Sequence, residues 1–154
     1  MTSKWLIAVI LLLVILAALA FFSRKSVRAE LAIAANPTEV GSTITDPDSY
    51  PSWNPILIEV NGRFIEGETL AVVMKNDDGS TTNVQAKARK VVPNSTLNQV
   101  GGIPGVLTFD HTWRLEETDE GTRVTQFEQY RGIGVLFWDP SSVQRAYAEG
   151  NQRL

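Results

Sequence analysis

His111 and Glu128 are the two residues of this chain best suited to proton transfer or ligand orientation. His111 is the single histidine among 154 residues, and the alternate positions around it are apolar: Leu107, Phe109, Trp113 and Leu115. Side chains two apart in a strand lie on one face, so we expect His111 to point into the core. A two-residue loop at Asp119-Glu120 would place Glu128 opposite His111, and would also pair Leu115 with Val124, Trp113 with Gln126, and Phe109 with Tyr130.

Two interpretations of this pair stay open. In the first, His111 and Glu128 form an acid–base or ligand-orienting pair inside a cavity. In the second, they are a buried cross-strand pair with a structural role, or Glu128 bonds a backbone amide. A shift of one residue in the loop would separate them.

Several other kinds of chemistry lack their residues. One histidine and no cysteine provide no metal-ligand set, so we expect no metal and no cofactor. The chain has 17 acidic against 14 basic residues and no cluster of Lys or Arg, which argues against nucleic-acid binding. The glycine-rich segment 101–105 lacks the lysine and following helix of a phosphate loop.

The N-terminus is a long apolar segment. Residues 5–22 contain no charge, and a bilayer core requires about 20 apolar helical residues. We therefore predict a single-pass membrane anchor with its basic flank over residues 1–25, and a folded domain over residues 26–154. The alternative is a cleaved signal peptide, because Ala18-Leu19-Ala20 fits the cleavage pattern. Arg24, Lys25 and Arg28 follow the segment and favour a cytoplasmic domain, with a periplasmic or extracellular one left open.

The sequence of the folded part predicts one strand, two short helices, six further strands and a last helix. A polar basic link at residues 23–26 leads into a strand over residues 27–33. Asn36-Pro37 then begins the first short helix, and Asp46-Pro47 ends it before the second. Further strands are predicted over residues 56–65, 68–75, 82–92, 96–100, 106–117 and 122–131. Asp139-Pro140 then begins a last helix, with one face made of Val143, Tyr147, Gly150 and Leu154.

Motifs spread over residues 27–154 carry a family resemblance: Pro37-x-Glu39-Val40, Thr45-Asp46, Tyr50-Pro51-x-Trp53-Asn54-Pro55, Pro104-Gly105, Trp113-x-Leu115-Glu116, Gly121-Thr122-Arg123-Val124, Glu128 and Arg131-Gly132. Their order and spacing resemble the SRPBCC (START-like) superfamily, in particular its polyketide cyclase/dehydrase-like branch. The resemblance implies an α+β helix-grip fold, in which a seven-stranded antiparallel sheet surrounds a C-terminal helix and an apolar cavity lies between them. Gly41 stands where relatives usually carry a bulky apolar residue, and the terminal helix is short.

The resemblance and the apolar segment together predict a membrane-anchored domain that binds a hydrophobic small molecule or lipid. The membrane contact is made by residues 5–22, and the cavity walls are formed by Leu31, Ile33, Val84, Ala86, Leu97, Phe109, His111, Trp113, Val124, Gln126, Glu128, Tyr130, Val143 and Tyr147. One alternative is a cyclase/dehydrase-type enzyme with His111 and Glu128 as the catalytic candidates. Another is a non-catalytic interaction module of a cell envelope, which a cavity filled by Phe137 or Trp138 would favour.

Overall fold

Seven strands, a long N-terminal helix and a short C-terminal helix account for most of the chain in the computed structural model, which describes residues 2–76 and 78–154 without the side chains of residues 2 and 20. The helices and strands, in chain order, are α1 (Thr2–Phe22), β1 (Arg24–Ile33), α2 (Pro37–Thr45), α3 (Tyr50–Trp53), β2 (Leu57–Asn61), β3 (Thr69–Lys75), β4 (Thr81–Val92), β5 (Thr96–Ile103), β6 (Leu107–Thr118), β7 (Gly121–Arg131) and α4 (Ser141–Asn151). Two 3₁₀ turns, η1 (Pro47–Ser49) and η2 (Ile133–Phe137), complete the order.

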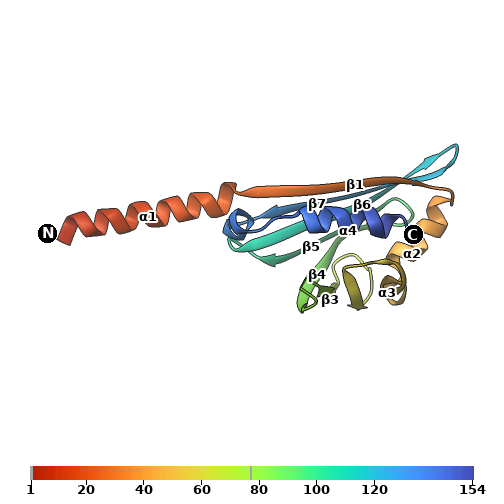
Figure 1. Ribbon diagram of the computed structural model, residues 1–154, viewed down its shortest axis with the longest axis horizontal. Coiled ribbons are helices and arrows are strands. Elements are labelled where there is room, and N and C mark those ends of the chain that lie inside the picture. The colour runs from red at the N-terminus through yellow and green to blue at the C-terminus, as the bar shows by residue number, and fades with distance from the viewer. Residues whose placement is uncertain (1, 77) are drawn as a thin grey trace.

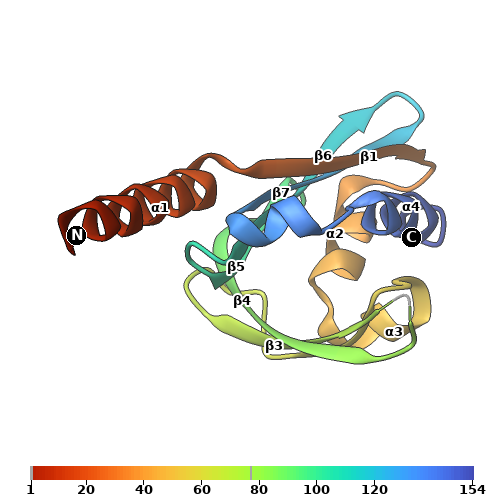
Figure 2. The same ribbon diagram turned by 60° about the vertical axis from the view of Figure 1, so that its left-hand side comes forward.

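The strands form one antiparallel sheet in the order β1-β7-β6-β5-β4-β3-β2. The sheet curls, and α4 runs along its inner face beside β1 and β7 (Figures 1 and 2). Along β7 buried side chains alternate with more exposed ones, as expected for a sheet covered on one face. The predicted helix-grip architecture is confirmed.

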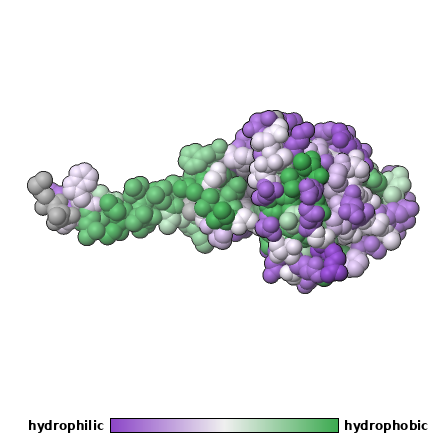
Figure 3. All heavy atoms as spheres, turned by 90° about the horizontal axis from the view of Figure 1, so that it is seen from below, coloured by the Kyte–Doolittle hydropathy of each residue, from purple (hydrophilic) through white to green (hydrophobic). Residues whose placement is uncertain are grey.

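The first helix leads straight into the sheet. Only Ser23 separates α1 from β1, because β1 already begins at Arg24. The predicted polar link at residues 23–26 is therefore wrong: residues 24–26 pair with the end of β7, Arg24 opposite Arg131, and only Ser23 is left as a connection. The large apolar side chains described along α1 lie open on a helix that projects from the domain (Figure 3).

Among the residues whose side chains are described, which excludes residue 20 inside α1, no helix is both long and apolar enough to cross a membrane. The predicted anchor over residues 5–22 includes that residue and stays a prediction.

Helix α2 begins as its sequence predicts. The side chain of Asn36 accepts hydrogen bonds from the backbone N–H groups of Thr38 and Glu39, both at 3.0 Å, and the Glu39 carboxylate accepts the Asn36 N–H at 3.1 Å. This reciprocal capping satisfies donors that the first helical turn leaves unpaired. Asp46 in turn caps η1 by accepting the N–H of Asp48. The segment from α2 to α3, which we call the α2–α3 block, therefore begins with two capped turns and carries aromatic residues toward the core.

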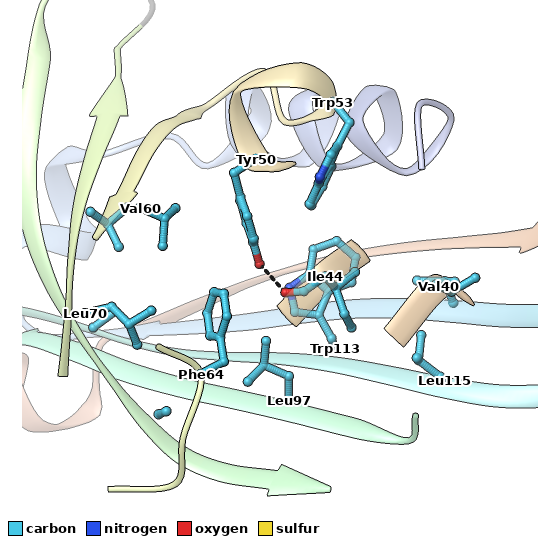
Figure 4. Packing of buried hydrophobic residues seen from close by; sticks show 14 residues of the cluster. Val40, Ile44, Tyr50, Trp53, Val60, Phe64, Leu70, Leu97, Trp113 and Leu115 are labelled. Atoms are coloured by element: carbon cyan, nitrogen blue, oxygen red, sulfur yellow. Dashed lines mark hydrogen bonds between the residues drawn. The ribbon is translucent and has the colours of Figure 1, made fainter. Parts of the chain in front are cut away.

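The main hydrophobic cluster joins those aromatic residues to the middle of the sheet (Figure 4). The Tyr50 ring lies 4.7 Å from that of Trp53 and 5.7 Å from that of Phe64, and its hydroxyl donates to the carbonyl of Ile44. Trp53 in turn meets Trp113 edge-on at 6.0 Å. The two tryptophans are thus core residues that fix the α2–α3 block onto β6.

Gly41 has a packing reason. A Cβ atom at this position would lie 2.9 Å from Oδ1 and 3.1 Å from Cα of Asn94, which turns the chain between β4 and β5 with a φ of 57°. The missing side chain lets α2 approach that turn, and the Asn94 side chain donates to the Thr38 hydroxyl there. The departure from the family pattern therefore comes with close helix–turn packing.

Replacing Gly41 with leucine is expected to lower the free energy of unfolding by about 2 kcal/mol or more, because the side chain collides with the Asn94 backbone. Gly41→Ala is the control: its gain of about 1 kcal/mol in helix propensity offsets the cost of moving the Asn94 side chain aside and of shifting the Asn94 backbone by a few tenths of an ångström. Urea unfolding of both variants measures the difference. Equal stability of the leucine and alanine variants would contradict this packing.

The C-terminal helix is tied to the edge of the sheet. The Gln144 side chain accepts from the N–H of Arg28 at 2.8 Å and donates to the carbonyl of the same residue, so α4 continues the hydrogen bonding of β1. Gly150 lies against the Pro55 ring, where a Cβ would be 3.1 Å away. Of the predicted helix face, Val143 and Gly150 are buried and Tyr147 is half-buried, whereas Leu154 follows the end of the helix.

Candidate functional site

The inner face of β6 and β7 has the predicted register. His111 pairs with Glu128, Trp113 with Gln126, and Phe109 with Tyr130. The two-residue loop at Asp119-Glu120 fixes this pairing, and the side chains of His111, Gln126 and Glu128 are buried. The placement of His111 and Glu128 as inward cross-strand neighbours is confirmed.

His111 hydrogen-bonds with two amides rather than with Glu128. Its Nδ1 lies 3.2 Å from Oε1 of Gln99, and its Nε2 lies 3.0 Å from Nε2 of Gln126. Because a carboxamide oxygen only accepts, Nδ1 carries the proton and Nε2 accepts from Gln126. Both ring nitrogens are thereby satisfied, and no hydrogen bond joins His111 to Glu128 among the residues that the structure describes.

Glu128 bonds with two tyrosines from different elements. The hydroxyls of Tyr130, on β7, and Tyr147, on α4, both donate to its Oε2. The Tyr147 ring also packs against His111, with the ring centres 5.4 Å apart. Among the described residues, no side chain donates to the other carboxylate oxygen, Oε1. The cluster Glu128–Tyr130–Tyr147 is therefore a polar bridge between the sheet and the C-terminal helix.

Burial sets the charge of these groups. Desolvation raises the pKa of Glu128 to about 7, although the two tyrosine hydrogen bonds act in the opposite direction. Desolvation lowers the pKa of His111 to about 4, so its imidazole is neutral near pH 7. The pKa values of Tyr130 and Tyr147 rise, first through burial and then through the neighbouring Glu128 charge. Glu128 is thus the one group of the cluster that changes charge near neutral pH.

Most of the predicted apolar wall residues belong to one or both of two hydrophobic clusters. Nine are buried: Ala86, Leu97, His111, Trp113, Val124, Gln126, Glu128, Tyr130 and Val143. Five are half-buried: Leu31, Ile33, Val84, Phe109 and Tyr147. Ala86, Leu97, Trp113, Val124 and Ile33 belong to the main cluster, Tyr130, Val143 and Tyr147 belong to the smaller one under α4, and Phe109 touches both. Leu31 and Val84 belong to neither described cluster.

Side chains of the chain itself pack into the interior under α4. Trp138 packs on Tyr130 with the ring centres 4.5 Å apart, whereas the neighbouring Phe137 is 86% exposed. The hollows described lie elsewhere; one of about 430 Å³, on the outer face of β1, β6 and β7, is lined by charged side chains such as Arg28 and Arg123. Of the two residues considered from sequence, Trp138 thus packs against the smaller cluster, and Phe137 does not.

Sequence reasoning missed two residues of this region. Gln99 lies within the predicted strand over residues 96–100, but its partner follows only when residues 104–106 are taken as the turn, which pairs Gln99 with His111 across β5 and β6. Asn151, near the end of α4, is 1% exposed, and its amide has no hydrogen-bond partner among the described residues. No sequence signal marked it.

The fold agrees with a family comparison. The model of the family described as polyketide cyclase / dehydrase and lipid transport matches residues 24–154. The chain belongs to this family. No curated protein matches it.

Solved structures share the fold at low identity. A protein of Chromobacterium violaceum superposes with a TM-score of 0.70 at 13% identity, over 83% of this chain and 93% of its own. An uncharacterized protein from Rhizobium leguminosarum gives 0.67 at 17% identity, over 85% and 91%. The di-domain ARO/CYC StfQ from the steffimycin biosynthetic pathway gives 0.65 at 13% identity, over 84% of this chain and 48% of that one. At these identities the likeness concerns the fold alone.

Proposed function

We propose that this chain binds a hydrophobic small molecule or lipid between the inner face of the sheet and α4, with a polar group of the ligand at Glu128. The observation that carries the proposal is the buried carboxylate of Glu128, which bonds Tyr130 from the sheet and Tyr147 from α4. The family's description as polyketide cyclase / dehydrase and lipid transport agrees with such a ligand.

A buried carboxyl group is an energetically unfavourable means of attaching a helix to a sheet. Burying an ionised carboxylate is strongly unfavourable, and apolar residues of similar volume usually pack at least as stably. Ligand sites, in contrast, place a few polar groups on apolar walls to orient what they bind. Here Phe109, Trp113 and Val143 supply the apolar surroundings of the cluster.

The ligand enters in this proposal when α4 moves. Tyr147 is the member of the cluster that α4 carries, and the Gln144 contacts to Arg28 lie at the outer edge of β1. Displacing the helix frees Oε2 of Glu128 from one tyrosine and opens the smaller hydrophobic cluster. Because the pKa of Glu128 is about 7, its carboxyl group both donates and accepts hydrogen bonds near neutral pH. This suits a neutral hydroxyl or carbonyl group on an apolar body.

Proton transfer is the second candidate function, and the raised pKa of Glu128 is the observation that favours it. Glu128 would then act without His111, whose two nitrogens already bond Gln99 and Gln126. Chemical conversion of the bound molecule by the native chain, absent in Glu128→Gln, would favour this candidate.

Membrane attachment through α1, with the domain on the cytoplasmic side, is also part of the proposal. Side chains such as Leu6, Leu13 and Phe21 are 62%, 59% and 79% exposed, and each leucine-sized side chain moved from water to lipid gains roughly 1.5–3 kcal/mol. The basic residues after α1 favour the cytoplasmic side. A lipid ligand would then be exchanged with the adjacent bilayer.

The test is the amount of ligand that the full chain retains. Protein purified in a mild detergent is extracted with organic solvent, and the released molecules are quantified by mass spectrometry. Glu128→Gln is expected to lower the ligand-to-protein ratio about tenfold. The charged form of Glu128 is well populated at neutral pH because the pKa is about 7, and a hydrogen bond from a ligand hydroxyl to it contributes about 1.5–3 kcal/mol, which the neutral amide does not supply.

Glu116→Gln is the matched control, because Glu116 lies on the outer face of β6 and pairs there with Arg123. Its ratio is expected to equal that of the native chain. A native chain from which no apolar molecule is released would overturn the proposal, as would equal retention by the two variants.

A further inference from the structure

The end of the domain next to α1 carries a group of exposed apolar side chains from three separate segments. We call this group the collar and define it as Phe21, Phe22, Ile103, Val106, Leu136 and Phe137. Their exposed fractions are 79%, 75%, 65%, 52%, 47% and 86%. Two residues come from the end of α1, two from the β5–β6 turn and two from η2.

Backbone hydrogen bonds hold the three segments together. The N–H of Gly132 donates to the carbonyl of Ser23 at 3.2 Å, next to α1. Those of Ile133 and Gly134 donate to the carbonyls of Gly105 and Val106, at 3.1 and 2.8 Å. The collar is therefore one built surface and not a set of loose loops.

Gly132 makes this close approach possible. Its φ is 121°, and a Cβ atom there would lie 2.4 Å from the carbonyl oxygen of Val106. A side chain at this position would push η2 away from the β5–β6 turn.

We propose that the collar lies against a lipid bilayer and sinks into its interfacial layer, holding the domain close to the membrane. The apolar surface of α1 continues onto this end of the domain (Figure 3), so a bilayer is the one apolar phase that covers the helix and the collar together. A protein partner would have to surround both.

The charges beside the collar fit the same occupant. Arg24, at the start of β1, lies opposite Arg131 on β7. Lys25 follows, and its ammonium group donates a hydrogen bond to the carbonyl of Trp138. Basic residues beside an apolar surface are attracted to anionic lipid headgroups. Asp139 lies close to Lys25. Hydrogen bonds from Ser141 lower the pKa of the Asp139 carboxyl most, and the Lys25 charge lowers it further.

The inference rests on the proposed attachment of α1 and is independent of the ligand under α4. The chain has no cysteine, so single cysteines can be introduced and labelled with an environment-sensitive fluorophore. The collar variants are Ile103→Cys and Phe137→Cys, Leu12→Cys reports on α1, and Ile58→Cys is the control. Ile58 is 38% exposed on β2, the edge strand opposite β1.

The full chain is reconstituted into vesicles of phosphatidylcholine and phosphatidylglycerol. Quenching by aqueous iodide is expected to be about threefold weaker at positions 103 and 137 than at 58, and quenchers on the lipid headgroups should act on 103 and 137 alone. Acyl-chain quenchers should reach position 12.

Collar labels as open to iodide as the control would overturn the proposal, and lipid quenching at position 12 would show that the attachment of α1 still stands. Collar labels shielded from iodide but untouched by lipid quenchers would also overturn it, in favour of a protein partner or a second copy of this chain. Lipid quenching at 103 and 137 without quenching at 12 would support the collar and contradict the attachment.

Discussion

Replacing Trp113 with alanine is expected to lower the free energy of unfolding by about 3–5 kcal/mol, the usual loss for a fully buried aromatic residue. Trp113 is 1% exposed and joins three parts of the fold. Its ring meets that of Trp53 at 6.0 Å and that of His111 at 5.5 Å, and its backbone pairs with Leu97 on β5. Because domains are stable by only about 5–15 kcal/mol, this one change removes a large share of the total.

Trp113→Phe is the matched control. It keeps an aromatic ring and removes the indole N–H, which is buried without a hydrogen-bond partner among the described residues. We expect its loss to be smaller by about 2 kcal/mol or more, since it keeps most of the buried ring and removes an unpaired buried donor whose desolvation costs about 1–3 kcal/mol. Urea unfolding of the full chain in a mild detergent measures both. A comparable loss in the two variants would show that the ring volume is not what Trp113 supplies.

The pH dependence of stability is expected to reveal two buried groups that act in opposite directions. Burial raises the pKa of Glu128 from 4.5 to about 7, so its contribution is complete below pH 4.5 and is lost as the pH rises to 7. Burial lowers the pKa of His111 from 6.5 to about 4, so its contribution is complete above pH 6.5 and is lost as the pH falls to 4. Each amounts to about 3 kcal/mol, at about 1.4 kcal/mol for each unit of pKa.

Single substitutions should reveal how each group separately changes the free energy of unfolding with pH, compared with the native chain. Glu128→Gln leaves the His111 contribution, and its free energy of unfolding should rise by about 3 kcal/mol between pH 4 and 6.5. His111→Gln leaves the Glu128 contribution and should show a fall of about the same size between pH 4.5 and 7. The double variant should show neither slope. Chemical denaturation at a series of pH values provides the comparison, and slopes of the same sign in both single variants would refute it.

The sequence predicted the pairing of His111 with Glu128 because two local facts were sufficient. Alternation placed both side chains inward, and the Asp119-Glu120 loop fixed the register of the hairpin. Their hydrogen-bond partners could not be predicted in the same way. Gln99 comes from the strand on the other side of β6, and Tyr147 comes from a helix whose position depends on the whole curled sheet.

Gly41 and the basic residues after α1 show that contacts between distant parts of the chain also limited the prediction of the fold. Helix propensity and the family pattern marked Gly41 as unfavourable, but its contact with Asn94 joins residues far apart in the chain. The basic residues after α1 looked like a linker, yet they extend β1 along the end of β7. Composition cannot distinguish a polar linker from an edge strand, since an edge strand is polar on its open side.

Because a single residue separates α1 from β1, a tilt of the helix is transmitted directly to the domain. The ten residues of β1 extend about 33 Å from the end of α1, so a change of about 10° in the tilt of the helix would move the far end of the strand by about 6 Å. That far end leads into the α2–α3 block, which packs on the main hydrophobic cluster. With α1 attached to a bilayer as proposed, a change in the thickness of that bilayer would rotate the whole domain, because no flexible linker stands between them to absorb the change.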